Sequence, residues 1–294
     1  MSTLDTRTHL AHANSFLFVP GTQPARVEKA LASGADFVIL DLEDAVAPGD
    51  KDSARASIAQ TVQALPHAQR ARLLVRMNAA GTAWFEPDLE LLAQLVPQGL
   101  AGVVIPKAED AATLHTVAQR CGAQALLVPL VESVAGIDAL NALCQAPQVV
   151  RVAFGHLDFQ VDAGMQCGAD EIELLPTRMA IVMASRRHQL AAPIDGVTVD
   201  TRDMTHVHSD TARAVRMGFG AKLCIHPAQI ATVNTVFAPT EAAVEHAHAV
   251  LQAMEAAQGG VCVVKGKMVD APVLHLANQT LQRHTFAAQR LAVA

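Results

Sequence analysis

Residues 126 to 158 read LLVPLVESVAGIDALNALCQAPQVVRVAFGHLD, and this stretch decides the expected fold. Its two apolar runs, LLVPLV and VVRVAF, have the length of strands buried on both faces, as in a parallel sheet. A helix-like segment near 134–143 separates them, and each run ends close to a carboxylate, Glu132 or Asp158. We therefore expect a strand–helix–strand unit with acidic side chains at its strand ends.

The same alternation runs along most of the chain. The other expected strands are SFLFVP (15–20), FVILDLED (37–44), RLLVRMN (72–78), GVVIPK (102–107), PIDGVTVD (193–200) and AKLCIHP (221–227). The expected helices cover about 26–32, 51–63, 85–95, 110–120, 134–143, 171–189, 209–217, 228–236 and 241–257. Eight such alternations predict an α/β protein with a (β/α)8 barrel. A doubly wound open sheet is the alternative, although no G-x-G-x-x-G follows the first strand to indicate dinucleotide binding.

The expected organisation is an N-terminal arm (1–14), the barrel (15–257) and a C-terminal extension (258–294). The extension reads as a short hairpin followed by a helix. Its run VCVVKGKMVDAPVL is apolar enough to need burial, which the surface of a neighbouring subunit would supply. The alternative is that the extension folds back on its own barrel.

Composition excludes several classes of function. Aromatic residues make up 3% of the chain and Tyr is absent, which argues against stacking on nucleic-acid bases. The net charge is −6 without a basic block, which argues against a polyphosphate partner. The N-terminus lacks a signal-peptide pattern, and no apolar run approaches the roughly 20 residues of a membrane span. Five scattered cysteines without a C-x-x-C pair predict reduced packing residues of a cytoplasmic protein.

Glu132 and Asp158 are the first candidate site residues. Neighbouring strands lie about 4.8 Å apart, so two carboxylates at adjacent strand ends could converge on one ion. Two carboxylates with room for water and a substrate oxygen suit Mg²⁺. Alternatively, each carboxylate caps the helix that follows it or pairs with a base.

A buried arginine beside acidic residues is the second candidate. Arg76 stands two residues before a strand end, where burial requires an anion such as Glu43, Asp44 or a substrate carboxylate. An internal salt bridge explains Arg76 as well. Asp41 and Glu43 are expected on one face of their strand and Asp44 on the other. Lys107 is expected either as a second anion contact or in a salt bridge at the barrel mouth.

An ordered set of motifs then resembles a known family. The segments are SFLFVPGTQPARVEKALASGADFVILDLEDAV, LLVRMNA, GVVIPKAE, LLVPLVESVAGI, AFGHLDF, PIDGVTVD, GAKLCIHPAQI and KGKMVDAP. Their order over about residues 15 to 280 is similar to that of the CitE-like lyases of the HpcH/HpaI aldolase group. That group includes the citrate lyase β subunit, citramalyl-CoA lyases and malyl-CoA lyases. No single motif is specific, but the ordered set is.

The resemblance implies a barrel with Mg²⁺ at its strand ends and an acyl thioester substrate, carried on CoA or on an acyl carrier protein. It implies that Glu132 and Asp158 bind the metal and that Arg76 binds the keto-acid part. Asp270 would be the catalytic acid/base, delivered by the tail of a neighbouring subunit in a homotrimer or a multiple of it. It also places four residues at contacts with the acyl carrier or substrate: Phe18, Lys29, Ile194 and Asp195.

Two departures from the family pattern stand out. Leu157 replaces a carboxylate before Asp158, which predicts a less acidic metal shell. Gln23 and Ala25 occupy places where the family often has basic residues, which removes expected contacts to the CoA phosphates.

The sequence therefore predicts a Mg²⁺-dependent carbon–carbon lyase acting on a 3-hydroxy-3-carboxy acyl thioester. The alternatives are an aldolase acting on free hydroxy-keto acids, or a carrier-binding subunit of a larger lyase complex.

Overall fold

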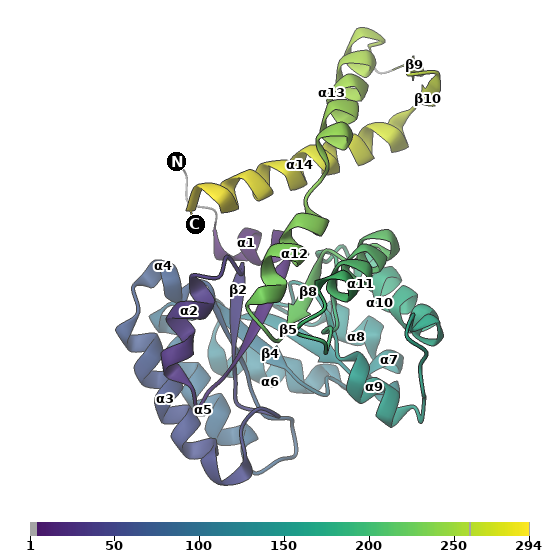
Figure 1. Cartoon of the computed structure of the whole chain (residues 1–294). Helices are drawn as coiled ribbons and strands as arrows, with labels where there is room; N and C mark the ends of the chain where they lie inside the picture. The colour runs from purple at the N-terminus through teal and green to yellow at the C-terminus, as the bar shows by residue number, and fades with distance from the viewer. Residues whose placement is uncertain (1–4, 259, 294) are drawn as a thin grey trace. The chain divides into compact units, whose positions relative to one another are not determined.

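The computed structural model describes residues 5–258 and 260–293, with the side chains of 291–293 excepted. Within them lies a closed barrel of parallel strands that pair in chain order, so the expected (β/α)8 barrel is confirmed (Figure 1). The barrel strands are β1 (Ser15–Pro20), β2 (Phe37–Asp41), β3 (Leu73–Arg76), β4 (Gly102–Ile105), β5 (Leu126–Val131), β6 (Ala153–Phe154), β7 (Ile194–Asp195) and β8 (Ala221–Cys224).

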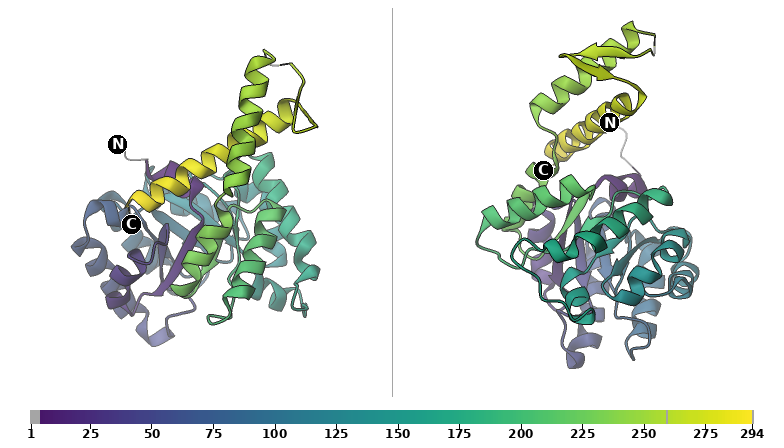
Figure 2. Two further views of the ribbon diagram at one scale, coloured as in Figure 1. Left: turned by 45° about the horizontal axis from the view of Figure 1, so that its top comes forward. Right: turned by 90° about the vertical axis from the view of Figure 1, so that its right-hand side faces the viewer.

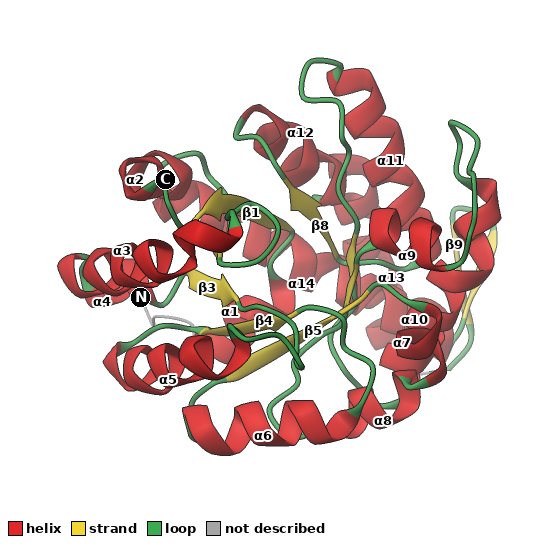
Figure 3. Cartoon of the chain, turned by 90° about the horizontal axis from the view of Figure 1, so that it is seen from below, coloured by secondary structure: helices red, strands yellow, loops and turns green. Residues whose placement is uncertain are grey.

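Helices surround the strands as an outer ring (Figure 3). They are α2 (Val27–Leu31), α3 (Lys51–Ala64), α4 (His67–Arg70), α5 (Phe85–Leu95), α6 (Ala111–Cys121), α7 (Val134–Asp138), α8 (Leu140–Gln145), α9 (His156–Asp162), α10 (Leu175–Arg187), α11 (Met204–Met217) and α12 (Ala228–Phe237). A further helix, α1 (Thr6–His12), lies at the end of the barrel where the strands begin (Figure 1).

Apolar side chains fill the barrel interior, and α1 contributes to this core. Leu10 of α1 is fully buried and belongs to the same cluster as Phe16 and Phe37, whose rings stack at 5.6 Å. Arg151 donates to the carbonyls of Leu10 (3.1 Å) and Ala13 (2.8 Å) at the end of α1. The expected N-terminal arm therefore contains a docked helix, because an apolar side chain and a buried guanidinium hold it; residues 1–4 lie outside the described part.

The register of the first three strands sets up the acidic mouth of the barrel. Pro20 of β1 pairs with Asp41 of β2, and Asp41 pairs with Arg76 of β3. Register partners on neighbouring strands point to the same side of a sheet. The carboxylate of Asp41 and the guanidinium of Arg76 therefore meet at the C-terminal end of the barrel, where enzymes of this fold carry their active sites.

Two strands are shorter than the sequence predicts. β6 keeps only Ala153 and Phe154. Val149 makes an isolated bridge to Leu127, and residues 150–152 are not part of a strand. β7 keeps only Ile194 and Asp195. Pro193 lacks an N–H before β7, and after it Gly196 packs so closely on the His156 ring that a Cβ would lie 2.1 Å from Nδ1.

Three helices differ from the expected bounds. The helix expected over 134–143 is divided into α7 and α8. The helix expected from residue 171 begins at Leu175, after a 3-10 turn and a left-handed residue, Glu171 (φ 51°). The helix expected from residue 209 begins at Met204, because the Asp203 side chain accepts from the backbone N–H groups of Thr205 and His206.

The chain divides into two compact units, 1–233 and 234–294, so the boundary falls within α12. The second unit contains α13 (Glu241–Ala256), β9 (Cys262–Val264), β10 (Lys267–Val269) and α14 (Ala271–Val293) (Figure 2). The expected hairpin and following helix are therefore present. A small core that includes Val250, Met254 and Val269 joins these elements, while Val263 and Met268 stay exposed on the hairpin. None of the described helices has the length and apolar character to cross a membrane.

Candidate active site

Arg76 is the centre of an ion-pair cluster at the barrel mouth. Its Nε and Nη2 donate to the two carboxylate oxygens of Asp41, at 2.7 and 2.6 Å. Phe18 covers one face of the guanidinium, with its ring centre 4.8 Å from Cζ. Burial alone would lower the pKa of Arg76, but the hydrogen bonds and charge of Asp41, with the other carboxylates nearby, raise it. The arginine therefore stays charged and is held in one orientation, as the salt-bridge interpretation predicts.

The third nitrogen of the guanidinium faces two further carboxylates. Nη1 of Arg76 lies 3.0 Å from Oε2 of Glu43 and donates to Oδ2 of Asp44 at 3.2 Å. The expected opposition of Glu43 and Asp44 does not occur, because β2 ends at Asp41 and strand alternation stops there. The side chain of Asp44 is 61% exposed, so this contact can be exchanged for a ligand at little desolvation cost.

Glu43 is a buried carboxylate with an unsatisfied oxygen. Its Oε2 approaches Arg76 without hydrogen-bond geometry and has no hydrogen-bond partner among the described residues. Burial raises the pKa of Glu43 to about 7, and Asp44 and Asp41 add to the rise while Arg76 opposes it. A cation close to this carboxylate would relieve the electrostatic cost.

Glu132 follows β5 directly and is 3% exposed. It does not cap α7, because Ser133 accepts from Gly136 N–H there. Instead Oε1 of Glu132 accepts from the backbone N–H of Lys107 at 2.8 Å, and no basic side chain among the described residues forms an ion pair with Glu132. Burial raises the pKa of Glu132 to about 8, with the charges of Glu43 and Asp158 adding to the rise. Both alternatives to metal binding are thus absent for Glu132.

Asp158 lies in the first turn of α9 and is exposed. The helix follows β6, the strand that pairs with β5, so Glu132 and Asp158 come after adjacent strands, Glu132 directly and Asp158 four residues beyond Phe154. The two carboxylates are close enough to interact, because the charge of Asp158 contributes to the raised pKa of Glu132.

A buried polar cluster supports the β6 and β7 side of the mouth. Oε1 of Glu171 lies 3.2 Å from Nε2 of His156, and Oε2 accepts from Arg178 and Arg213. Nε of Arg178 donates to Asp195 at 3.0 Å. Burial would raise the pKa of Glu171, but His156 and the arginines lower it below the ordinary value. His156, which directly precedes the departure at Leu157, is therefore part of a structural network.

The residues expected at substrate contacts fall in different settings. Phe18 packs on Arg76, and Lys29 is exposed on α2. Ile194 and Asp195 are buried, at 1% and 0% exposure, and the Asp195 side chain is engaged by Arg178. Asp270 belongs to the second unit, where its Oδ1 accepts from Val273 N–H at the start of α14.

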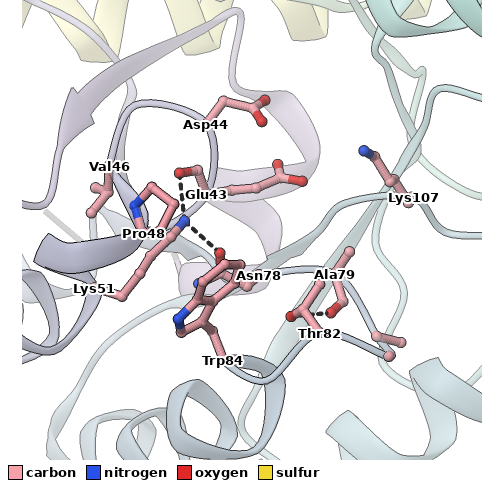
Figure 4. Close-up of a pocket in the computed structure, with 12 residues that line it drawn as sticks. Glu43, Asp44, Val46, Pro48, Lys51, Asn78, Ala79, Thr82, Trp84 and Lys107 are labelled. Carbon is pink, nitrogen blue, oxygen red and sulfur yellow. Dashed lines mark hydrogen bonds between the residues drawn. The ribbon is translucent and has the colours of Figure 1, made fainter.

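A cavity of about 480 Å³ adjoins the carboxylates (Figure 4). It is lined by the loops after β2, β3 and β4; the lining residues are Glu43, Asp44, Val46, Pro48, Lys51, Asn78, Ala79, Ala80, Gly81, Thr82, Trp84 and Lys107. Lys107 adopts a left-handed backbone (φ 44°), which allows its N–H to reach Glu132. The cavity therefore lies between Lys107 and the carboxylates of Glu43 and Asp44, which follow β2.

The donor set fits Mg²⁺ better than a metal that needs a full cage of protein ligands. Among the described residues, no three or more His, Cys, Asp or Glu side chains are grouped as ligands. Mg²⁺ keeps several waters and takes one or two carboxylates together with ligand oxygens. Glu132 carries a buried carboxylate with a raised pKa, and the charges of Glu43 and Asp158 repel it. Such a group is stabilised by a cation.

A closed parallel barrel with this carboxylate and arginine cluster at its C-terminal mouth has the layout of a barrel enzyme. Residues 14–227 match the family model described as HpcH/HpaI aldolase/citrate lyase. The chain belongs to the HpcH/HpaI aldolase/citrate lyase family, which confirms the resemblance.

Relatives and a solved structure agree with this membership. An L-malyl-CoA/beta-methylmalyl-CoA lyase from Cereibacter sphaeroides is 34% identical over 284 residues, covering 86% of this chain and 89% of the relative. A (3S)-malyl-CoA thioesterase from the same species is 32% identical, with 94% and 96% covered. The crystal structure of CitE from Mycobacterium tuberculosis with magnesium, acetoacetate and coenzyme A has a TM-score of 0.80 at 32% identity, covering 94% of this chain and 99% of that one.

Several residues of the site have no signal in the sequence. Lys51 and Asn78 line the cavity and bond each other, although Lys51 would pass for an exposed residue at the start of a helix. Glu171, Arg178 and Arg213 come together from segments that are far apart in the chain. Charge spacing along one helix or loop cannot reveal contacts of this kind.

Proposed function

We propose that the chain is a Mg²⁺-dependent carbon–carbon lyase. It cleaves a 3-hydroxy-3-carboxy acyl thioester of the citramalyl-CoA, malyl-CoA or citryl-carrier type into an α-keto acid and an acyl thioester. Family membership and the lyase among the relatives support the reaction class. The CitE structure that contains magnesium and coenzyme A supports the metal and the thioester. A cytoplasmic location accords with the five cysteines, all of which are free thiols.

One observation carries the proposal. Glu132 is a buried carboxylate that forms no ion pair with a basic side chain among the described residues. Arg76, whose guanidinium is fixed by Asp41, lies at the same end of the barrel. The arginine suits the carboxylate of the keto-acid part, and the acidic group suits a divalent cation. A substrate with a carboxylate beside a hydroxyl needs both.

Each residue has a defined task in the cleavage direction. Glu132 and Asp158 would hold Mg²⁺, which when bound supplies Lewis-acid polarisation and a template for the substrate oxygens. Nη1 of Arg76 would exchange Asp44 for the substrate carboxylate, since Asp41 keeps Nε and Nη2. Because Asp41 fixes the guanidinium beforehand, the developing charge meets a donor that need not reorient.

The bond changes balance without an organic cofactor. The substrate hydroxyl would give its proton to the carboxylate of Asp270 and become the keto group, and the electrons of the broken C–C bond would pass to the thioester as an enolate. Asp270 would then return a proton to the enolate carbon, or remove it in the reverse condensation. The α-keto acid and the acyl thioester leave.

A shared active site is part of the proposal. Asp270 of one chain would serve the barrel mouth of a neighbour in a homotrimer or a multiple of it. The hairpin supports this arrangement, because Val261, Val263 and Met268 are about two-thirds exposed (68%, 68% and 67%), and a second copy would cover them. The alternative, in which the tail serves its own barrel, predicts activity in a monomer.

A substrate panel tests the reaction. Purified protein with Mg²⁺ would be offered malyl-CoA, citramalyl-CoA and citryl thioesters, together with free hydroxy-keto acids. Keto-acid release and free-thiol release would be measured separately. We expect keto acid without free thiol. Free thiol as the first product would favour the thioesterase named among the relatives, and turnover of free acids alone would favour an aldolase.

Two further measurements test the assigned residues. Glu132→Ala and Asp158→Ala should lose Mg²⁺ dependence and most activity while keeping the fold, so near-normal turnover in either variant would refute the ligand assignment. For the shared site, Asp270→Ala chains would be co-assembled with Glu132→Ala chains. Activity should partly return, because some interfaces then combine an intact tail with an intact metal site. A verified mixed oligomer without activity would refute sharing.

A further inference from the structure

Lys51, at the start of α3, carries a buried ammonium under the barrel mouth (Figure 4). The residue is only 5% exposed. Its Nζ donates to the carbonyl oxygens of Leu42 (2.6 Å) and Glu43 (2.8 Å), and to Oδ1 of Asn78 (2.6 Å). Three acceptors satisfy the three N–H groups of an ammonium.

Lys51 binds acceptors that lie just beyond the point where the pairing of β2 with β3 ends. β2 stops at Asp41, so the carbonyls of Leu42 and Glu43 lie beyond its last ladder residue. Asn78 lies two residues beyond the end of β3. Lys51 therefore links the segments that directly follow two neighbouring strands: the segment after β2 carries Glu43, and Arg76 is the last residue of β3.

Asn78, the side-chain acceptor for Lys51, is itself held in place by Asp88. The backbone N–H and the side-chain amide of Asn78 both donate to Oδ2 of Asp88, at 2.8 and 2.6 Å. Asp88 is fully buried on α5, and its Oδ1 accepts from Arg55 of α3 at 2.8 Å. Asn78 can therefore offer Oδ1 to Lys51 in only one orientation.

An aromatic ring completes the site of the ammonium. Nζ of Lys51 lies 5.0 Å from the ring centre of Trp84, which is the single tryptophan of the chain. A cation at this distance from a ring face is stabilised by cation–π attraction. Burial lowers the pKa of Lys51, while Asp41, Asp88 and the other carboxylates act in the opposite direction.

We propose that Lys51 is a positioning residue of the active site: it fixes the turn after β2, so that the Glu43 carboxylate keeps its place against Nη1 of Arg76. Glu43 reaches Nη1 at 3.0 Å, and this nitrogen is the one that the proposed function leaves to substrate. The inference rests on that function. Lys51 acts through the backbone of Leu42 and Glu43, because its three N–H groups are all used by these two carbonyls and by Asn78.

Two matched variants separate positioning from stability. Lys51→Met removes the ammonium and keeps a similar length. Arg72→Met removes a half-buried cation that, like Lys51, donates to backbone carbonyls, here those of Leu31 and Ala35, but it precedes β3 and contacts neither Glu43 nor Arg76. Both variants lose a buried or partly buried cation, so both should unfold at lower temperature. Only Lys51→Met should alter the position of the Glu43 carboxylate at the barrel mouth.

Binding and turnover would be measured well below the unfolding temperature of each variant. The first readout is the affinity for pyruvate with Mg²⁺, by calorimetry, and the second is kcat/KM on the best thioester. A third is the emission of Trp84, which reports directly on the loss of the ammonium. Lys51→Met should lose roughly 10- to 100-fold in affinity and kcat/KM, as is usual for groups that orient a site, and its Trp84 emission should shift. Arg72→Met should stay within about twofold of the wild type in all three readouts.

The outcomes separate this inference from the proposed function. If Lys51→Met binds and turns over like Arg72→Met, Lys51 is only structural, although wild-type turnover upholds the lyase. If the wild-type protein binds pyruvate with Mg²⁺ but cleaves no thioester, the lyase fails, and the affinities of the two variants still decide the role of Lys51.

Discussion

Gly155→Ala is expected to displace the Glu132 side chain without replacing any residue of the proposed metal site. Gly155 follows β6 and lies against the Glu132 side chain. A Cβ at position 155 would come within 2.4 Å of Oε2 and 2.6 Å of Cβ of Glu132. Neither atom can move freely, because Glu132 Cβ belongs to the segment just after β5 and Oε1 is tied to the Lys107 N–H.

The size of the effect follows from these distances. Ordinary contact begins at 3.4 Å, so Oε2 must retreat by about 1.0 Å and Cβ by about 0.8 Å. A misplacement of about 1 Å costs on the order of 100-fold in rate. The crowding itself should lower the free energy of unfolding by about 1–3 kcal/mol. We therefore expect a folded protein with weak Mg²⁺ affinity and kcat/KM reduced about 100-fold.

Gly49→Ala is the matched control, because a Cβ at position 49 meets nothing within 4 Å. Both variants would be compared by calorimetric titration with Mg²⁺ and by kcat/KM over a range of Mg²⁺ concentrations, below their unfolding temperatures. The reasoning fails if Gly155→Ala binds Mg²⁺ and turns over within about twofold of Gly49→Ala. That result would mean that the place of Glu132 does not control the metal.

Two further predictions concern the charged clusters. Arg76→Lys should lose most of kcat/KM, by about 10²-fold or more, because an ammonium cannot hold Asp41 through two parallel bonds and also face a substrate carboxylate; steady-state kinetics checks this, and an unchanged kcat/KM would leave Arg76 as a salt-bridge residue only. Glu171→Gln should lower the free energy of unfolding by about 3 kcal/mol at pH 7, because it leaves the buried Arg178 less compensated. The pKa of Glu171 is lowered in the folded state, so its contribution is present above the ordinary carboxyl pKa of about 4.3 and fades as the pH falls through the folded value. Urea unfolding of both proteins at pH 7, 5 and 3.5 should show the difference unchanged from pH 7 to 5 and smaller at 3.5; a constant difference at all three would contradict the argument.

The barrel could be predicted because its strands are long apolar runs at regular spacing. Leu126 to Val131 and Phe37 to Asp41 are buried at every position, so composition alone marks them. The proximity of Asp41 to Arg76 also follows from pattern, since both end neighbouring strands. β6 and β7 could not be bounded in this way, because the Leu127–Val149 bridge is isolated from the rest of the β6 ladder, and Pro193 and the close packing of Gly196 limit β7.

The support of the site could not be predicted, because it depends on long-range contacts of residues with ordinary local roles. Lys51 is a polar residue in the first turn of a helix, and only the fold brings Asn78, 27 positions later, to its ammonium. The sequence predicts Glu171 as the first residue of a helix. In the structure its backbone is left-handed, and its carboxylate contacts Arg178 and Arg213. Residues that bind a ligand follow strand ends, whereas those that orient them can come from anywhere in the chain.

The pairing of β1 with β8 has a consequence for synthesis on the ribosome. Ser15 pairs with Lys222, so the ring of strands cannot close until more than 220 residues have left the ribosome. The docking of α1 is delayed in the same way, because Arg151 follows Leu10 by 141 positions. A nascent chain therefore carries β1 as an open edge next to unburied apolar side chains for most of its translation, which is the period when pairing with other chains competes with folding.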